Sequence, residues 1–381
     1  MRTENTSGIA GAERAVSERG VAGRRRPGKR TGVLLINLGT PDSASFPDVY
    51  RYLTEFLNDP RVIDISPLGR FFLVNFIIIP FRARNSTRIY KQLFDLNNGV
   101  APLLEYGIGL RDALRERLSS EGVSVELAMR YGEPSLDEVC ARMEKEVYDE
   151  IVVLPLFPQY ASSSTGSALE KALRFIRNWY VVPEIKVVSS YHDHPGYIET
   201  MVRRARKYDV DSYDHVLFSY HGLPDRQIFK TYPKRECYSG CDCTERIHGE
   251  NYSCYLAQCY STSRLLAARL GIPEDKYTVA FQSRLDKEWI EPFSDKVVIE
   301  QAAKGAKRML AFSPAFVADC LETTIEIGDE YLELFREHGG ETLDLVESLN
   351  LHPLWIDTVE DLIRGQMAEG LVERPEPDVR S

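Results

Sequence analysis

Eight short runs of apolar, mostly β-branched residues are the feature that most limits how this chain can fold. Each run is closed by Gly, Pro or Ser and is followed by a helical pattern. Nearly continuous hydrophobic runs suit parallel strands that helices cover on both faces. The expected strands are 33–38, 125–131, 150–156 and 186–191 in the first half, and 215–220, 277–282, 308–313 and 343–348 in the second.

The two halves repeat their turn residues, which suggests duplication of a four-stranded unit. GTP at 39–41 follows the first strand of one half, and GLP at 222–224 follows the first strand of the other. Alternating strands and helices predict two α/β domains, each a four-stranded parallel sheet flanked by helices, facing a central cleft. In such sheets, ligands bind outside the carboxyl ends of the strands.

The expected domain boundaries follow from this repeat. The first domain takes 31–187 together with about 350–370, and the second takes 188–349. Residues 1–30 hold eight Lys or Arg and three Glu but no apolar run, which predicts a disordered tail.

The overall charge and the amino-terminal segment narrow the partners and the compartment. The net charge of −10 argues against nucleic acid, because no basic excess is present to replace phosphate counterions. The amino-terminal segment lacks the apolar core of a signal peptide, so we expect a cytoplasmic protein. The sequence does not set the oligomeric state.

The longest apolar stretch, 71–81 (FFLVNFIIIPF), allows two interpretations. It is too short for a transmembrane helix, which needs roughly 20 apolar residues. One interpretation is a buried helix. The other is peripheral membrane contact through 66–82, helped by nearby arginines. These arginines are Arg70, Arg82, Arg84 and Arg88.

His221 directly follows the strand 215–220, where a ligand would bind. Imidazole is the side chain whose ordinary pKa lies near neutrality, so it suits proton abstraction. A lone histidine more often only forms hydrogen bonds, and the assignment therefore depends on its neighbours.

A row of carboxylates follows the strand 308–313. Glu322, Glu326 and Glu330 are spaced at i, i+4 and i+8, which places them on one face of a helix. Such a row is most often a solvated face. The alternative is a path of oxygen ligands for a divalent cation, or a path for protons.

Six motifs in register resemble the ferrochelatase family from about residue 31 to about residue 365. They are LLINLGTPDS, MRYGEP, LPLFPQYASSSTGS, HVLFSYHGLP, FQSRLDKEWIEP and AFSPAFVADCLET. The resemblance implies two Rossmann-like, chelatase-type domains and insertion of Fe²⁺ into a porphyrin in the terminal part of haem biosynthesis. It implies that His221 is the catalytic proton acceptor and that Glu322 is its acidic partner. Metal or protons would then pass along Glu322, Glu326 and Glu330, and metal contact would extend to His221.

The resemblance also implies a set of porphyrin-binding residues. Arg130 and Tyr131 would meet the porphyrin carboxylates and edge, and Trp289 would form a wall of the pocket. Ser219 is a further candidate. Leu38 stands where relatives that use coproporphyrin III typically carry Tyr, which favours protoporphyrin IX. Cys320 stands where animal enzymes have a second histidine, so the metal path depends more on carboxylates.

Five of the seven cysteines lie within an insertion at 237–259, and their density points to a metal. They are Cys237, Cys241, Cys243, Cys254 and Cys259. Zinc sites commonly use two CxxC pairs, which are absent here. The irregular spacing and the resemblance favour a [2Fe–2S] cluster held by four of the five. Cys140 and Cys320 are isolated and are expected to be small buried residues.

Two rival functions remain. One is a chelatase of the same fold that acts on sirohydrochlorin, but such enzymes are typically shorter and rely on paired histidines. The other is a porphyrin carrier with redox sensing by the cluster, which would need no proton acceptor near a carboxylate row.

Overall fold

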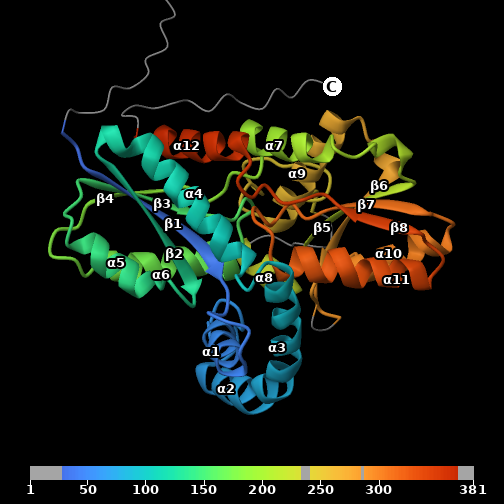
Figure 1. Cartoon of the computed structure of the whole chain (residues 1–381), viewed down its shortest axis with the longest axis horizontal. Coiled ribbons are helices and arrows are strands. Elements are labelled where there is room, and N and C mark those ends of the chain that lie inside the picture. Colours follow the sequence, from blue (N-terminus) through green and yellow to red (C-terminus); the bar gives the residue numbers. More distant parts are fainter. Residues whose placement is uncertain (1–27, 233–240, 285–286, 368–381) are drawn as a thin grey trace, which may run out of the picture.

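The computed structural model describes residues 28–232, 241–284 and 287–367 (Figure 1). A strand forms at each of the eight predicted places, although the fourth strand of each half is shorter than predicted and begins earlier. The strands form two parallel sheets with the orders β2-β1-β3-β4 and β6-β5-β7-β8. The same order in both halves is what duplication of one unit would produce. The strands are β1 Thr31–Gly39, β2 Val123–Tyr131, β3 Glu150–Pro155, β4 Glu184–Val187, β5 His215–His221, β6 Tyr277–Gln282, β7 Arg308–Phe312 and β8 Thr342–Leu345.

Helices cover both faces of each sheet. In Figure 1, α4 and α12 lie above the first sheet and α5 and α6 below it, while α7 and α9 lie above the second sheet and α10 and α11 below it. The helices are α1 Phe46–Leu57, α2 Pro67–Phe72, α3 Ile79–Leu96, α4 Pro102–Leu118, α5 Leu136–Glu144, α6 Ser167–Ile176, α7 Pro195–Ala205, α8 Asp225–Thr231, α9 Tyr255–Leu270, α10 Ser294–Ala303, α11 Tyr331–Glu337 and α12 Pro353–Met367.

The strand β1 shows why the apolar runs are continuous. Val33 and Leu35 belong to the largest core cluster, whereas Leu34 and Ile36 belong to a second cluster on the opposite face of the sheet. Alternate side chains of a strand point to opposite faces, so both faces require apolar residues. The largest cluster continues through α7 and α9 into β5 and β7, and it therefore joins the two halves.

The turn after β1 requires a glycine. Gly39 has a φ of 114°, and a Cβ at this position would lie 1.8 Å from the carbonyl oxygen of Tyr131. A side chain cannot be accommodated at that distance, because the approach is to backbone. The turn thus holds the carboxyl ends of β1 and β2 together, as the register pair of Gly39 and Tyr131 also shows.

The predicted amino-terminal tail, 1–30, includes residues that contact the first sheet. Lys29 forms an ion pair of 2.8 Å with the buried Glu150, and the Arg30 amide donates to Asp149. These contacts hold the residues before β1 on the sheet, so 28–30 belong to the fold. The rest of the predicted tail, 1–27, lies outside the described residues.

The carboxyl-terminal helix α12 returns to the first half of the chain. It packs against α4 and β3, and also against α7. Arg364 on α12 pairs with Glu121 of the first half at 2.6 Å. These contacts join α12 to both halves of the chain, so the assignment of about 350–370 to the first domain stays a prediction.

The segment from α1 to α3 projects away from both sheets (Figure 1). A π-helix, Leu73–Ile78, joins α2 to α3 without a break. A small core of its own packs within this projection, formed by Leu57, Ile63, Val74, Ile79 and Ala83. The interpretation of 71–81 as a buried helix is wrong, because Phe71 and Phe76 are 51% and 62% exposed. Among the described residues, no helix is long and apolar enough to cross a membrane.

Candidate active site

His221 ends β5, a central strand of the second sheet, and its ring orientation is set by the next residue. The imidazole Nδ1 lies 2.7 Å from the carbonyl oxygen of Gly222. A carbonyl can only accept a hydrogen bond, so Nδ1 must carry the proton in the neutral ring. The lone pair of the neutral imidazole is therefore on Nε2, which can accept a proton.

Gly222 and Trp289 shape the turn behind the histidine. The Gly222 amide donates to the carbonyl oxygen of Gln282 at 2.8 Å. A Cβ on Gly222 would lie 2.7 Å from that oxygen and 3.2 Å from Cε3 of Trp289. The Trp289 ring centroid is 6.5 Å from that of His221, so the tryptophan lies beside the imidazole, and its role as a porphyrin wall stays a prediction.

Glu322 begins a π-helix, Glu322–Glu330, that leads directly into α11. The sequence predicts a helix here, and the structure specifies the wider form, which is uncommon and often found at functional sites. Glu322 lies near two phenols of the projecting segment. Burial, together with the negative charge of Glu322, raises the pKa of both Tyr52 and Tyr90. The first half of the chain thus reaches the carboxylate row.

Glu326 is the most tightly held member of the row. The Ser283 amide donates to its Oε1 at 3.0 Å, and the Ser283 hydroxyl donates to its Oε2 at 2.6 Å. Tyr331 donates a third bond, at 3.2 Å. Burial and the neighbouring Glu322 nevertheless raise the pKa of Glu326 to about 7, so this carboxyl can gain or lose a proton near neutral pH.

The row reaches the surface at Glu330. Its carboxyl is exposed, and its pKa is raised by partial burial and by the neighbouring charges of Glu333 and Asp329. Asp329 accepts a hydrogen bond of 2.8 Å from Gln92 on α3. The carboxylates therefore run from the half-buried Glu322 to solvent, along the contact between the π-helix and α3.

Arg130 and Tyr131, at the carboxyl end of β2, are 8% and 0% exposed and share one buried partner. The Asp59 carboxylate accepts hydrogen bonds from Arg130, from the Tyr131 hydroxyl at 2.8 Å and from the Ser167 hydroxyl at 2.5 Å. The Arg130 Nε also donates to the Ser167 hydroxyl at 2.7 Å. The Nε and Nη2 atoms of the guanidinium are thus hydrogen-bonded, and Nη1 lies 4.0 Å from Glu55.

The prediction that Ser219 binds substrate is not supported by its position. Ser219 is fully buried, and its hydroxyl bonds Gln282 at 2.6 Å and Ser294 at 2.8 Å. It has no exposed surface to offer a porphyrin, and instead it holds the carboxyl end of β6. Leu38 is half-buried, one residue before the turn at Gly39.

Loops of the first half contact the segment that follows His221. Asp64 forms ion pairs of 2.6 Å with Arg226 and with Lys230, both on α8. The Gln227 amide donates to the carbonyl oxygens of Arg61 and Val62. The two halves therefore meet around the carboxyl end of β5. A separate hollow of about 560 Å³ on the outer side of α6 includes neither His221 nor Glu322.

Three thiols of the cysteine-rich insertion lie together. Burial raises the pKa of Cys243, and its thiol is within hydrogen-bonding reach of Cys241 and Cys254. Within the described ranges no group of three or more side chains has the geometry of a metal site. Cys237 lies outside the described residues. As predicted, Cys140 and Cys320 are buried.

Sequence reasoning missed several residues that hold the site. Ser283 could have been found, because it directly follows β6 and the rule on strand ends applies to it. Asp59 gave no signal, since it lies in a loop far from Arg130 in the sequence. Tyr255 likewise gave none, because its hydroxyl donates to the main-chain carbonyl of His221, which is 34 residues away in the sequence.

Comparison with known proteins identifies the class of this chain. The ferrochelatase family model matches residues 30–367. The chain is 42% identical over 344 residues to a ferrochelatase of Legionella pneumophila strain Lens, covering 88% of this chain and 99% of the relative. It is 40% identical over 349 residues to one of Coxiella burnetii strain Dugway 5J108-111, covering 89% and 94%.

Among solved structures, SirB from Bacillus subtilis with Fe³⁺ aligns with a TM-score of 0.49 and 12% identity, over 89% of this chain and 96% of that one. The family match and the curated relatives define this protein as a metal-porphyrin chelatase, which is a lyase. The chain belongs to the ferrochelatase family, whose reaction is the insertion of ferrous iron into a porphyrin in haem synthesis.

Proposed function

We propose that this chain inserts Fe²⁺ into protoporphyrin IX, with His221 as the proton acceptor and the row Glu322, Glu326 and Glu330 as the path for metal or protons. The observation that carries the proposal is the hydrogen bond between Nδ1 of His221 and Gly222, which leaves Nε2 as the basic nitrogen. This nitrogen lies at the carboxyl end of a central strand, where ligands of such sheets bind.

The reaction needs two N–H bonds of the porphyrin to break and four bonds from nitrogen to iron to form. Nε2 of His221 takes a pyrrole proton, so that the nitrogen lone pair becomes available to the metal. Glu326, with its pKa of about 7, can accept a proton and release it toward Glu330 and solvent. Two protons leave for each Fe²⁺ inserted, and no oxidant or reductant is consumed.

Protoporphyrin IX is the favoured substrate because of Leu38, which supplies an apolar side chain where coproporphyrin-using relatives typically carry Tyr. A protoporphyrin edge offers two carboxylates, and the partly occupied Arg130 has only Nη1 left for such a group. Trp289 would lie against the macrocycle, as an aromatic wall should.

The test is anaerobic incubation of the purified protein with Fe²⁺ and either protoporphyrin IX or coproporphyrin III. We expect faster insertion into protoporphyrin, and loss of insertion without loss of porphyrin binding in His221→Ala. Unchanged insertion by that variant would refute the role of His221. Faster turnover of coproporphyrin would refute the substrate assignment alone.

We also propose that Cys237, Cys241, Cys243 and Cys254 hold a [2Fe–2S] cluster. The thiols of Cys241, Cys243 and Cys254 are neighbours. Burial raises the pKa of Cys243 and so opposes loss of its proton, whereas binding of iron by the thiolate would favour that loss. The Asn251 amide lies 3.7 Å from the Cys243 sulfur and could donate to a thiolate there. Cys259 is the spare, because it is fully buried in α9 against Tyr255. When bound, the cluster would supply a one-electron redox centre and would tie the insertion to the fold.

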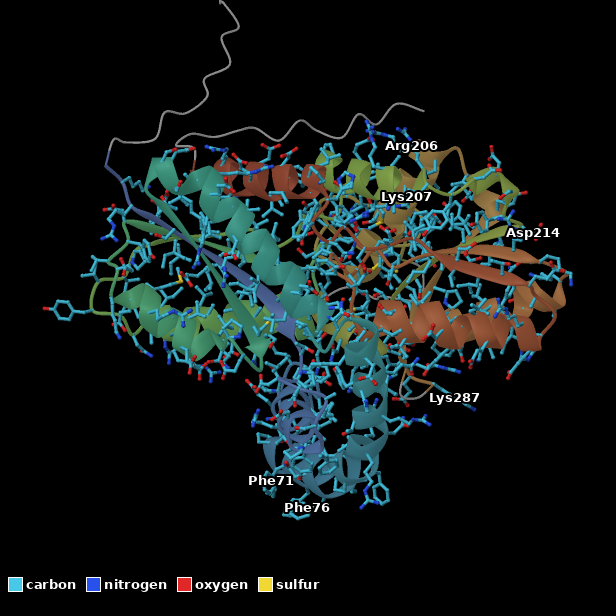
Figure 2. All side chains as sticks on the ribbon, in the orientation of Figure 1. Phe71, Phe76, Arg206, Lys207, Asp214 and Lys287 are labelled. Atoms are coloured by element: carbon cyan, nitrogen blue, oxygen red, sulfur yellow. The ribbon has the colours of Figure 1, made fainter. Side chains whose placement is uncertain are left out.

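We further propose that the projecting segment contacts an anionic membrane surface. Its outer end exposes large apolar side chains, and Figure 2 shows Phe71 and Phe76 at the end farthest from the sheets. The exposed set is Ile65, Leu68, Phe71, Phe72, Phe76, Ile77 and Phe81. Arg82, Arg84 and Arg88 are also exposed and would attract acidic headgroups.

A further inference from the structure

Tyr255, the first residue of α9, directs its hydroxyl at the main chain of His221. The hydroxyl donates to the carbonyl oxygen of His221 at 2.8 Å. The tyrosine is 6% exposed. A carbonyl oxygen can only accept a hydrogen bond, so the phenol carries the proton and is the donor.

This hydrogen bond completes the support of one peptide group. The peptide that joins His221 to Gly222 accepts from Tyr255 at its carbonyl and donates to Gln282 through the Gly222 amide. The next carbonyl, that of Gly222, accepts from Nδ1 of the same histidine. The orientation of the peptide between His221 and Gly222 thus sets the position of the Gly222 carbonyl, and this carbonyl selects the tautomer of the His221 imidazole.

Without the hydroxyl, the His221 carbonyl would lose its side-chain donor in a partly buried location. An unpaired carbonyl shielded from water is costly, and rotation of the peptide toward another donor or toward water would relieve that cost. Glycine follows directly and tolerates the change in backbone dihedrals, so the hydrogen bond from the Gly222 amide to Gln282 is the remaining contact that opposes rotation. Rotation would move the Gly222 carbonyl away from Nδ1 and would allow the proton to reside on Nε2 instead.

Tyr255 is also the point where the cysteine-rich insertion meets the site. It follows Cys254 directly, and the Cys259 thiol lies within hydrogen-bonding reach of the same hydroxyl. Displacement of the start of α9 would therefore move the donor that holds the His221 peptide.

We propose that Tyr255 is a positioning residue for His221, which keeps Nε2 as the basic nitrogen by fixing the peptide between His221 and Gly222. The inference rests on the proposed role of His221 as proton acceptor. It assigns to Tyr255 an effect on the rate of proton transfer and none on porphyrin binding.

The test compares Tyr255→Phe with Tyr208→Phe in the full chain. Tyr208 is a matched control, because its hydroxyl also donates to a main-chain carbonyl, that of Leu345 at 2.9 Å, on a strand distant in sequence from His221. Nitrogen-15 NMR of histidine-labelled protein reports the tautomer, with the His221 signals identified by their loss in His221→Ala. Steady-state insertion of Fe²⁺ into protoporphyrin IX gives kcat and KM.

We expect the wild type and Tyr208→Phe to show the Nδ1–H tautomer, and Tyr255→Phe to show a mixture that includes Nε2–H. In Tyr255→Phe we expect kcat to fall about tenfold with KM nearly unchanged. The expected loss is a part of the ~10²–10⁴-fold rate acceleration that a positioned base contributes. An intact Nδ1–H tautomer in Tyr255→Phe would overturn the inference, whatever its kcat. A changed tautomer with unchanged kcat would support the positioning and count against His221 as the proton acceptor.

Discussion

Ser283 holds Glu326 by two hydrogen bonds from a single residue, one from its amide at 3.0 Å and one from its hydroxyl at 2.6 Å. Ser283 achieves this with a φ of 62°, a left-handed conformation that side chains other than those of Gly, Asn and Asp rarely adopt. Backbone strain of this kind concentrates at functional sites. Ser283, at the end of β6, therefore affects the protonation state of Glu326 in the carboxylate row.

Removal of the Ser283 hydroxyl should raise the pKa of Glu326 above its present value of about 7, because that hydroxyl stabilises the carboxylate. In Ser283→Ala we expect the acidic limb of the kcat profile to move upward by about one pH unit, the equivalent of one hydrogen bond. Ser283→Gly is the control, since it loses the same hydroxyl but relieves the strain at φ 62°. Equal shifts in both variants would assign the effect to the hydroxyl, and a shift in neither would contradict it.

Glu326 should make stability fall as pH rises. Its folded pKa of about 7 lies above the ordinary value of 4.5, so the carboxyl favours folding while it is protonated. That contribution is fully present below pH 4.5 and is lost as pH rises through 7. Relative to the wild type, Glu326→Gln should gain about 3 kcal/mol in free energy of unfolding between pH 4.5 and pH 8. Urea denaturation at both pH values measures the difference, and parallel behaviour of the two proteins would contradict the pKa.

Gly222→Ala should displace the turn that orients His221. The added Cβ would meet the Gln282 carbonyl at 2.7 Å and the Trp289 ring at 3.2 Å, and neither neighbour is a flexible chain end. We expect a loss of about 1–3 kcal/mol in free energy of unfolding and a fall in kcat. Gly365→Ala on α12 is the control, because its Cβ meets nothing within 4 Å, and helix propensity favours Ala there. Wild-type kcat in Gly222→Ala would show that the turn tolerates the shift.

The proposed cluster should depend on Cys254 and be independent of Cys259. We expect anaerobically purified protein to show the visible absorption of a [2Fe–2S] centre, and Cys254→Ser to lose it together with bound iron and sulfide. Cys259→Ser should retain both, because that thiol is buried against Tyr255. Loss of the colour in Cys259→Ser with retention in Cys254→Ser would exchange the two assignments. A wild-type protein without iron, sulfide or colour would refute the cluster.

Membrane contact should depend on the apolar end of the projecting segment. We expect the wild type to sediment with vesicles of phosphatidylserine and phosphatidylcholine, and less with phosphatidylcholine alone. Phe71→Glu combined with Phe76→Glu should abolish sedimentation while the fold is unchanged, since both side chains are more than half exposed. Glu substitution at Tyr180, which is fully exposed outside that segment, is the control. Equal sedimentation of all three proteins would exclude this surface as the contact.

The sequence was informative wherever structure follows from neighbouring residues. The alternation of Val33 and Leu35 with Leu34 and Ile36 is local, and all eight strands were predicted from such runs. The position of His221 followed from the same logic, because strand ends define where ligands bind.

The features that the sequence did not predict depend on partners that are distant in the sequence. Ser219 lies near His221 along the chain, yet its hydroxyl bonds Gln282 in β6 and Ser294 at the start of α10. Arg130 is held by Asp59, which is 71 residues away, so its partial occupation could not be read locally. The spacing of Glu322 and Glu326 is compatible with an α-helix or a π-helix, so the spacing alone does not predict the π-helix at Glu322–Glu330.

The core shared by the two halves has a mechanical consequence. Hinge closure needs an interface that can separate, whereas here the largest apolar cluster runs without interruption from β1 and β2 into β5 and β7. Rotation of the two halves away from each other would expose that cluster to water, with a free-energy cost proportional to the apolar area exposed. Hinge opening between the two halves is therefore expected to be unfavourable, and Arg130 at the end of β2 and His221 at the end of β5 lie on sheets that share one core.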